Sequence, residues 1–92
     1  MFTLFQIHKA EIYSPTHILI EGELIRGEIE RDQRFILKHK KFIIDSILYG
    51  EDKIKHKVIR PGRCSFVLRT SSPKDVTPEL ISFIQGQIVQ VL

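Results

Sequence analysis

The feature that most constrains this chain is a recurrence of glycine-marked turns between short segments in which hydrophobic and polar residues alternate. Gly22 and Gly27 punctuate the first such segments, Gly62 follows a proline before a later one, and Gly86 precedes the last. Short alternating segments separated by regular turn signals are typical of antiparallel barrels, whereas a βαβ fold needs helices between its strands. The sequence therefore predicts an all-β barrel of six or seven antiparallel strands, in which these four glycines are structural turns.

The first strand pattern contains a break in its alternation. Phe5 and Ile7 share one face, but the next apolar residue, Ala10, has the opposite parity. A shift of one residue moves every later side chain to the other face of a strand. We therefore expect a β-bulge near His8 or Lys9, which would return Ala10 to the face of Phe5.

Two later patterns predict the strands of the middle third. Residues 42–49 are apolar on both faces, which is typical of a strand that lies inside a sheet or under a partner. Unbroken alternation over this segment predicts that one face carries Phe42, Ile44, Ser46 and Leu48. Residues 53–59 are expected to form one strand, and one face of it would carry Lys53, Lys55 and Lys57.

The connections also carry local signals. Asp32 is expected to adopt the left-handed backbone conformation of a turn, which Asp tolerates better than most residues. Thr77 before Pro78 is typical of a helix N-cap followed by proline at the first helical position. We therefore expect one short helical turn near residues 78–84, which Gly86 would end, and a final strand at 87–92.

Length and charge bound the classes of function. With 92 residues, the range 1–92 is expected to form one domain. The net charge of +3 is unevenly distributed along the chain. Residues 1–30 carry two basic and five acidic side chains, residues 31–63 carry ten basic and four acidic, and residues 64–92 carry two of each. An anionic partner is therefore expected to bind the middle third.

Missing motifs disfavour several other classes. Cys64 is the only cysteine, so no intrachain disulfide can form and a cytoplasmic location is the simplest expectation. No metal-ligand spacing and no phosphate-binding glycine loop occurs, so we expect no metal, nucleotide or other cofactor. Charged residues interrupt the apolar start of the chain by Lys9, so we expect neither a signal peptide nor a membrane span.

The order of the glycine motifs resembles that in the second domain of translational GTPases, the β-barrel found in elongation factor Tu and its relatives. Ile18–Gly27 is similar to a strand-turn run with two glycines, and 32–37 is similar to the next strand, with Asp32 where the family usually has Gly. Residues 61–63 and 86–89 resemble two later turns. The resemblance implies the barrel and structural roles for the glycines, but no residue that contacts tRNA, ribosome or nucleotide. Without a phosphate-binding loop, GTP hydrolysis is not expected.

Basic residues of the middle third are the candidate binding residues. Lysines at alternate strand positions lie about 7 Å apart, close to the phosphate spacing of an extended nucleic-acid strand. The same lysines would suit an acidic protein, or would prevent edge-to-edge aggregation of an edge strand. Few aromatic residues are expected at the surface to stack on RNA bases, only Tyr13 and Tyr49. The candidate site consists of Lys38, Lys40, Lys41, Lys53, Lys55, Lys57, Arg60 and Arg63.

These observations predict a non-catalytic binding module that engages a macromolecule, protein or RNA, through its basic surface. The alternative is a small immunity or antitoxin-like protein that neutralises a protein effector by charge and shape complementarity. An enzyme ranks third. Glu21 and Glu23 share a strand face, as paired acid-base carboxylates could, but they lack a cleft. Cys64 and His56 fall on apolar faces, which is typical of buried residues. Opposite charges in the first and middle thirds also allow a homo-oligomer.

Overall fold

The structure is a computed structural model that describes residues 3–49, 53–55, 57–58 and 61–91. Its strands are β1 (Thr3–Ser14), β2 (His17–Arg26), β3 (Ile29–Glu30), β4 (Arg34–Leu37), β5 (Lys40–Tyr49), β6 (Lys53–Lys55), β7 (Lys57–Val58), β8 (Gly62–Arg69) and β9 (Ile88–Val91). Its helical elements are the 3₁₀ turn η1 (Pro73–Asp75) and the α-helix α1 (Pro78–Ile84).

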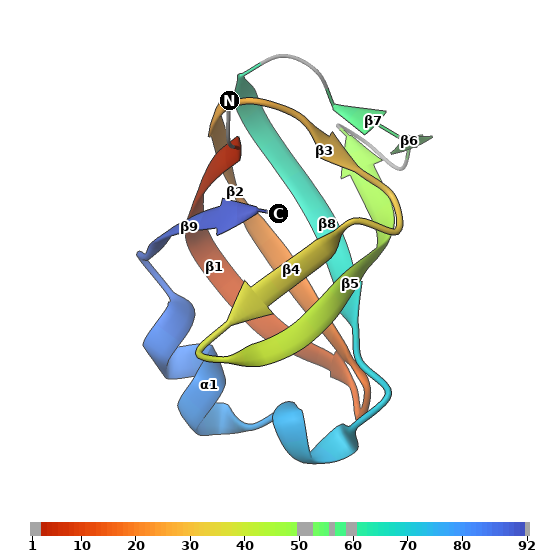
Figure 1. Ribbon diagram of the computed structural model, residues 1–92, viewed down its shortest axis with the longest axis vertical. Helices are drawn as coiled ribbons and strands as arrows, with labels where there is room; N and C mark the ends of the chain where they lie inside the picture. Colours follow the sequence, from red (N-terminus) through yellow and green to blue (C-terminus); the bar gives the residue numbers. More distant parts are fainter. Residues whose placement is uncertain (1–2, 50–52, 56, 59–60, 92) are drawn as a thin grey trace.

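Within the described part of the chain, six antiparallel strands close into a barrel. They follow the order β4, β9, β1, β2, β8 and β5, and β5 pairs with β4 to complete the ring (Figure 1). β6 extends the sheet beyond β5, while β3 and β7 form a separate two-stranded ribbon. The small antiparallel barrel predicted from the sequence is therefore confirmed.

The barrel interior is filled by side chains that alternate with outward-facing ones. Three phenylalanines meet near its centre: the Phe66 ring lies 5.0 Å from the Phe5 ring and 5.4 Å from the Phe35 ring, between centroids. Such tilted and edge-on contacts suit aromatic quadrupoles. The other fully buried large side chains are Ile7, Ile18, Ile20, Leu24, Ile29, Leu37, Phe42, Ile44 and Ile47.

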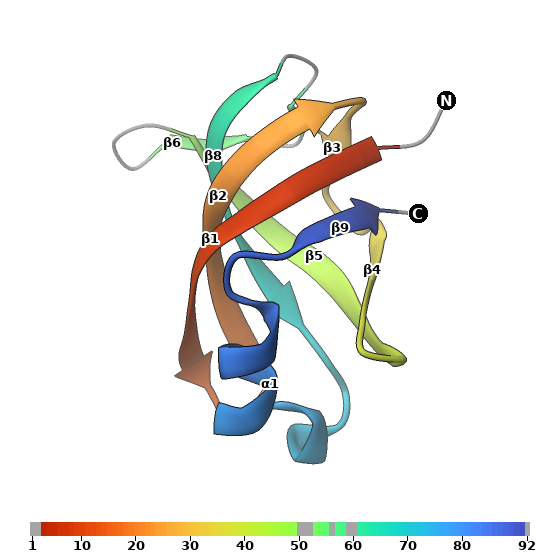
Figure 2. The same ribbon diagram turned by 90° about the vertical axis from the view of Figure 1, so that its left-hand side faces the viewer.

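Helix α1 closes one end of the barrel, below β1 and β9 (Figure 2). The Thr77 hydroxyl accepts a hydrogen bond from the Leu80 N–H, and proline follows it at the first helical position. Leu80 and Ile84 are buried against the barrel core. The helix predicted near residues 78–84 is confirmed, and the last strand is shorter than predicted, because β9 begins at Ile88.

The bulge predicted in the first strand is present. In the pairing of β1 with β2, Ile7 lies opposite Gly22 and Lys9 opposite Glu21, so His8 is the extra residue. Gly22 therefore lies inside β2 and not at a turn, which corrects the role predicted for it. A Cβ atom there would collide with the carbonyl oxygen of residue 6 and with the Phe5 ring. Glycine is needed here because two backbones approach closely at the bulge.

The other three glycines have positive φ angles, as turns require. Gly27 has φ +88° and lies against Thr3, whose hydroxyl donates to the Glu28 carbonyl at 2.9 Å and accepts from the Glu28 N–H at 3.0 Å. A side chain at Gly27 would collide with Thr3. Gly62 and Gly86 have φ +144° and +83°, with open space around them, so conformation alone explains glycine there.

A second bulge lies in β5, where the sequence predicts unbroken alternation. Ile44 pairs with Leu68 of β8, and Ser46 pairs with the adjacent Val67, so Asp45 is the extra residue. The bulge reverses the parity of the strand, which places Ile47 in the core together with Phe42 and Ile44. The predicted face of Phe42, Ile44, Ser46 and Leu48 is therefore wrong beyond residue 44.

The segment predicted as one strand at 53–59 is divided between two elements. β6 pairs with β5, with Lys55 opposite Ile47 and Lys53 opposite Tyr49. β7 pairs instead with β3, with Lys57 opposite Glu30. Long-range pairing with two different strands divides the segment, and local alternation carries no information about such pairing.

Among the residues that the structure describes, three other than glycine have positive φ angles. Asp32 has φ 69°, as predicted for its turn. Lys38 and His39 have φ 49° and 69°, which together form the two-residue turn between β4 and β5. Two consecutive left-handed residues define a type I′ turn, which matches the twist of a hairpin but normally contains Asn and Gly. Each left-handed residue of this type costs about 1 kcal/mol.

Candidate functional site

A row of outward-facing residues crosses five strands of the barrel near the end that α1 closes. Cross-strand pairing places Ser14 of β1 opposite His17, His17 of β2 opposite Arg69, Arg69 of β8 opposite Ile43, and Ile43 of β5 opposite Arg34. Neighbouring strands lie about 4.8 Å apart, so the row spans roughly 20 Å of the outer wall. It forms the border between two grooves.

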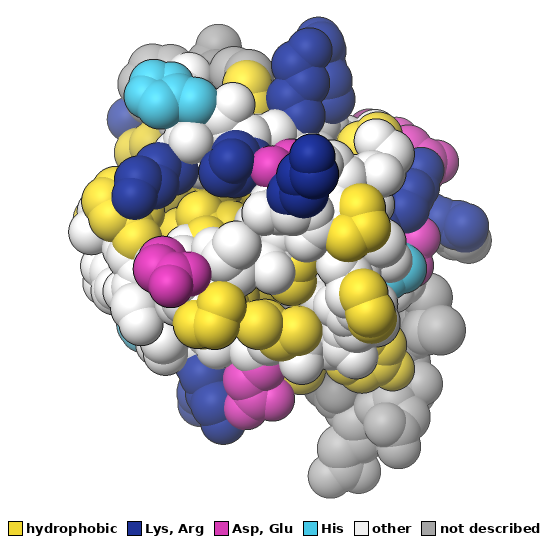
Figure 3. Space-filling model, turned by 90° about the horizontal axis from the view of Figure 1, so that it is seen from below, with side chains coloured by type: hydrophobic (Ala, Val, Ile, Leu, Met, Phe, Trp, Pro, Cys, Tyr) yellow, Lys and Arg dark blue, Asp and Glu magenta, His cyan; other side chains and the backbone are white. Residues whose placement is uncertain are grey.

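The first groove, called here the basic groove, lies toward the closed end and has a volume of about 520 Å³. Figure 3 views this end and shows Lys and Arg side chains gathered mainly along one margin, with hydrophobic side chains across the middle. The groove is lined by Thr16, His17, Arg34, Lys41, Phe42, Ile43, Arg69, Thr70 and Ser71. Three cations and three hydroxyl groups therefore line one concave surface.

The second groove, called here the apolar groove, lies on the other side of the row and has a volume of about 490 Å³. Its lining consists of Tyr13, Ser14, His17, Leu19, Asp45, Ser46, Leu48 and Val67. Val67 faces outward, between the inward-facing Phe66 and Leu68, yet only 6% of its surface is exposed. It is buried, but it lies outside the main cluster of core side chains in the barrel interior. Neighbouring side chains cover it, and the outer wall is concave here.

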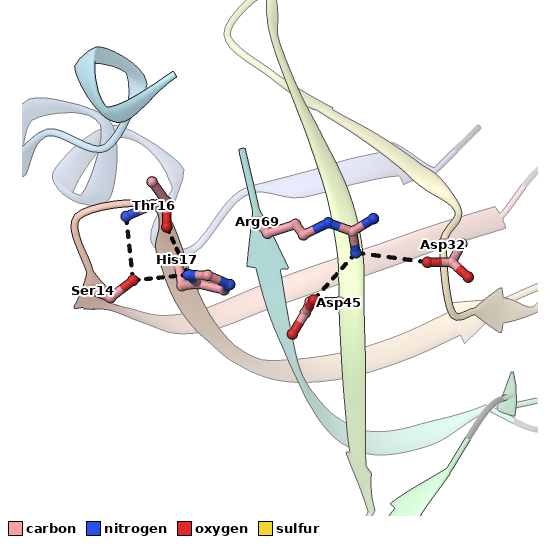
Figure 4. Close-up of polar contacts among 6 residues, drawn as sticks. All are labelled: Ser14, Thr16, His17, Asp32, Asp45 and Arg69. Carbon is pink, nitrogen blue, oxygen red and sulfur yellow. Dashed lines mark hydrogen bonds and ion pairs between the residues drawn. The ribbon is translucent and has the colours of Figure 1, made fainter. Parts of the chain in front are cut away.

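An ion-pair cluster stands between the two grooves. The Arg69 guanidinium donates to Asp45 at 3.2 Å and lies 3.6 Å from the carboxylate of Asp32 (Figure 4). The β5 bulge orients Asp45, and a hydrogen bond from the Asp32 N–H to the Ile44 carbonyl at 2.8 Å fixes the turn that carries Asp32. Arg69 is thus neutralised within the molecule.

A second polar cluster holds the turn between β1 and β2. The Nδ1 atom of His17 lies 2.8 Å from the Ser14 hydroxyl and 2.9 Å from the Thr16 hydroxyl, and the Thr16 N–H donates to Ser14 at 3.2 Å (Figure 4). These bonds link residues close in sequence, as is usual where hydroxyl groups stabilise a turn. They orient the His17 ring, which lines both grooves.

Lysines of the predicted hairpin tip differ in their contacts. The ammonium group of Lys38 lies 4.8 Å from the centroid of the Phe83 ring in α1, and Lys40 forms a 3.1 Å ion pair with Asp75 in η1. Both lysines therefore connect the hairpin to helical elements. Lys41 has no ion pair among the described residues and lines the basic groove.

Three of the remaining predicted site residues lie in the two short strands that follow β5. Lys53 and Lys55 are in β6, and Lys57 is in β7. Eight strand residues separate Lys41 from the position that pairs with Lys53, a distance of about 26 Å. Arg60 lies outside the described residues. The backbone of β6 therefore pairs with the end of β5 that lies far from the hairpin.

Arg63 lies at the start of β8, opposite Glu23 of β2. Lys9 and Glu21 are also opposite each other, on β1 and β2. The acidic face predicted for Glu21 and Glu23 is thus flanked by basic side chains on both neighbouring strands. Opposite charges on facing positions stabilise a sheet modestly.

Cys64 faces the barrel interior, with 5% of its surface exposed. Burial raises the pKa of its thiol to about 11, because a thiolate would lose its hydration there. Reactive cysteines have lowered pKa values and accessible sulfur atoms. Among the described residues, no group of three or more His, Cys, Asp or Glu side chains could hold a metal ion.

Sequence reasoning missed most of the two grooves. Arg34, Arg69 and His17 lie outside the densest charge run, and only strand pairing places them in one row. Leu19 and Val67 have the spacing of ordinary strand residues, so only the fold shows that both line a groove. Of the predicted site residues whose side chains the structure describes, Lys41 alone is in the lining of either groove.

No protein-family model matches the chain, and no curated protein matches it. The helices within the described ranges are too short or too polar to cross a membrane.

Proposed function

We propose that this chain is a non-catalytic binding module that holds a partner protein across the outer faces of β2, β8 and β5. The observation that carries the proposal is the position of Val67, an outward-facing apolar side chain in a groove of the outer wall, outside the main core cluster. Protein interfaces combine an apolar centre with a polar rim, and here the apolar groove borders the cations of the basic groove.

Tyr13 supports a protein partner. It is 68% exposed at the edge of the apolar groove. Tyrosine is enriched among the residues that contribute most to protein–protein binding. Sequence-tolerant binding of single-stranded RNA usually combines stacking aromatics with a continuous basic track. The hairpin cations and β6 lysines lie about 26 Å apart along β5, which disfavours such a track.

We further propose that the barrel is related to the second domain of translational GTPases. The closed six-stranded antiparallel ring supports this, together with the positive φ angles at the family-like glycines Gly27, Gly62 and Gly86. Fold alone does not define function, so the binding proposal depends on the grooves and not on this relationship.

Affinity purification from the native cell, with and without nuclease, tests the binding proposal. The decisive comparison is between Leu19→Lys, which places a charge in the apolar groove, and Ile25→Lys, which adds the same charge elsewhere on β2, where Ile25 is exposed. We expect a discrete protein partner that survives nuclease, is retained by Ile25→Lys, and is reduced about tenfold or more by Leu19→Lys.

Two outcomes would contradict the proposal. Loss of the captured material on nuclease treatment would indicate an RNA partner. Equal capture by both lysine variants would show that the partner binds elsewhere on the barrel. Circular dichroism and thermal unfolding of each variant exclude misfolding as the cause of a loss.

A further inference from the structure

We infer that the occupant of the two grooves is an extended acidic segment of the partner protein, with carboxylates in the basic groove and an apolar side chain in the apolar groove. This inference rests on the proposed function and specifies the chemistry of the partner. It follows from the distribution of charge, from the strand register and from the border between the grooves.

The charge of the basic groove is not balanced within the molecule. Arg34 and Lys41 are exposed and have no ion pair among the described residues. Arg69 is different, because Asp45 and Asp32 both approach it. Two uncompensated cations therefore remain on one concave surface. An occupant with carboxylates would satisfy both, while a basic segment would be repelled.

Hydrogen-bond donors in the same groove suit a carboxylate. Thr16, Thr70 and Ser71 line the groove beside the cations. The Thr16 hydroxyl is already within 2.9 Å of His17 Nδ1, so Thr70 and Ser71 are the hydroxyl donors for an occupant. Carboxylate oxygens accept several hydrogen bonds at once, and bonds to a charged acceptor are stronger than neutral ones. Thr70 donates its backbone N–H to the Thr16 carbonyl at 2.9 Å, which holds two of these residues together.

Strand register sets the spacing between the charged and apolar parts of the segment. The pair His17 and Arg69 is followed two residues along both strands by the pair Leu19 and Val67. Two residues of a strand span about 7 Å, and alternate side chains of an extended peptide have the same spacing. Arg34 lies two strands beyond Arg69, about 10 Å further across the wall. The acidic residues are therefore expected two to four positions from the apolar residue.

Asp45 determines which part of the segment lies in which groove. Its carboxylate lines the apolar groove, while its partner Arg69 lines the basic groove. An acidic side chain in the apolar groove would meet a like charge, whereas one in the basic groove would meet Arg34 and Lys41. Repulsion of one arrangement and attraction of the other together fix the register of an otherwise flexible segment.

Selection from a library of random twelve-residue peptides, displayed and captured on the folded chain, tests the inference. We expect the enriched peptides to contain Asp or Glu two to four positions from Phe, Leu or Ile. The double variant Arg34→Glu with Lys41→Glu should select Lys or Arg at those positions. Its matched control is Arg31→Glu with Lys74→Glu, which changes net charge equally at exposed residues outside both grooves.

Fluorescence anisotropy with one enriched peptide then measures how much each variant changes the affinity for that peptide. We expect the Arg34 and Lys41 double variant to bind the acidic peptide at least about tenfold more weakly, and the control variant to bind it within about twofold. Replacing both acids of the peptide by Gln should produce a similar loss. A uridine twelve-mer should bind more weakly than the peptide and show no preference between the two double variants.

Each opposite result overturns the inference. Enrichment without acidic residues, or equal losses in the two double variants, would show that the grooves do not select carboxylates. Tighter binding of the uridine twelve-mer, with loss confined to the Arg34 and Lys41 variant, would assign the basic groove to RNA. If capture of the native partner depends on Leu19 but not on Arg34 and Lys41, the proposed function stands and this inference fails.

Discussion

The inner and outer faces of the same barrel wall are used in different ways. On the inner face of β2 and β8, Gly22, Cys64 and Phe66 are buried, and a side chain at Gly22 would collide with the Phe5 ring and with the backbone of residue 6. On the outer face of the same strands, Leu19 and Val67 line a groove that the core does not require. Apolar residues on the inner face are explained by folding, so those sunk in the outer face call for a different explanation.

The largest difference in stability between substitutions on the two faces is expected at Gly22 and its neighbour Glu21. We expect Gly22→Ala to lower the free energy of unfolding by about 3 kcal/mol or more, because the new Cβ would collide with a backbone carbonyl that cannot rotate away. Glu21→Ala, on the exposed face, should change it by less than about 0.5 kcal/mol. Urea denaturation of both variants gives the difference, and similar values would remove the contrast between the faces.

The dependence of stability on pH tests whether the Cys64 thiol is buried on the inner face. Its raised pKa, about 11 in the folded chain against 9.0 ordinarily, arises from burial. As pH rises, the unfolded chain loses its thiol proton first, so the stability associated with the buried thiol is complete below pH 9 and is lost between pH 9 and 11. The loss is on the order of 2–3 kcal/mol.

The matched control separates Cys64 from other groups that titrate at high pH. In Cys64→Ala, the decline in stability between pH 9 and 11 should be smaller by that amount. Moving the thiol to the outer face, as Cys64→Ala with Ser65→Cys, should give rapid reaction with a thiol reagent at pH 8, where the natural chain reacts slowly. Equal reaction rates would show that the Cys64 sulfur is accessible.

Arg69 tests how much the outer face contributes to folding. Arg69 and its two partners, Asp32 and Asp45, are each more than a third exposed, so solvent screens their attraction. We expect Arg69→Met to lower the free energy of unfolding by about 0.5–1 kcal/mol. A double-mutant cycle with Asp45→Asn should give a coupling energy below about 1 kcal/mol. A much larger coupling would make the cluster a structural support and not simply a border between two grooves.

Sequence reasoning was most accurate where a signal is local. The bulge at His8 was predictable because apolar residues on either side of it have opposite parity, and only a bulge places both in the core. Thr77 and Pro78 marked the start of the helix in the same local way. Asp32 occupies a left-handed position for reasons contained in its own side chain.

Features that depend on distant residues could not be predicted. The bulge at Asp45 left no signal, because β5 is apolar on both faces and its parity can reverse without placing a polar residue in the core. Lys40 forms its ion pair with Asp75, which is 35 positions away in the sequence, so a local run of charges does not reveal that this lysine is paired. The grooves form from side chains of several strands and become visible only once the barrel is assembled.

The smallest effect on stability, and the sharpest test of the comparison, is expected from two lysines adjacent in sequence. Lys40→Met should lower the free energy of unfolding by about 0.5 kcal/mol, because it removes the ion pair with Asp75 that ties the hairpin to η1. Lys41→Met should change it by less than about 0.2 kcal/mol, since Lys41 has no ion pair among the described residues. Binding of the acidic peptide should show the reverse order, with the larger loss for Lys41→Met. Thermal unfolding and anisotropy on the same samples give both quantities. If Lys40→Met weakens the peptide more, the hairpin tip and not the basic groove is the contact surface.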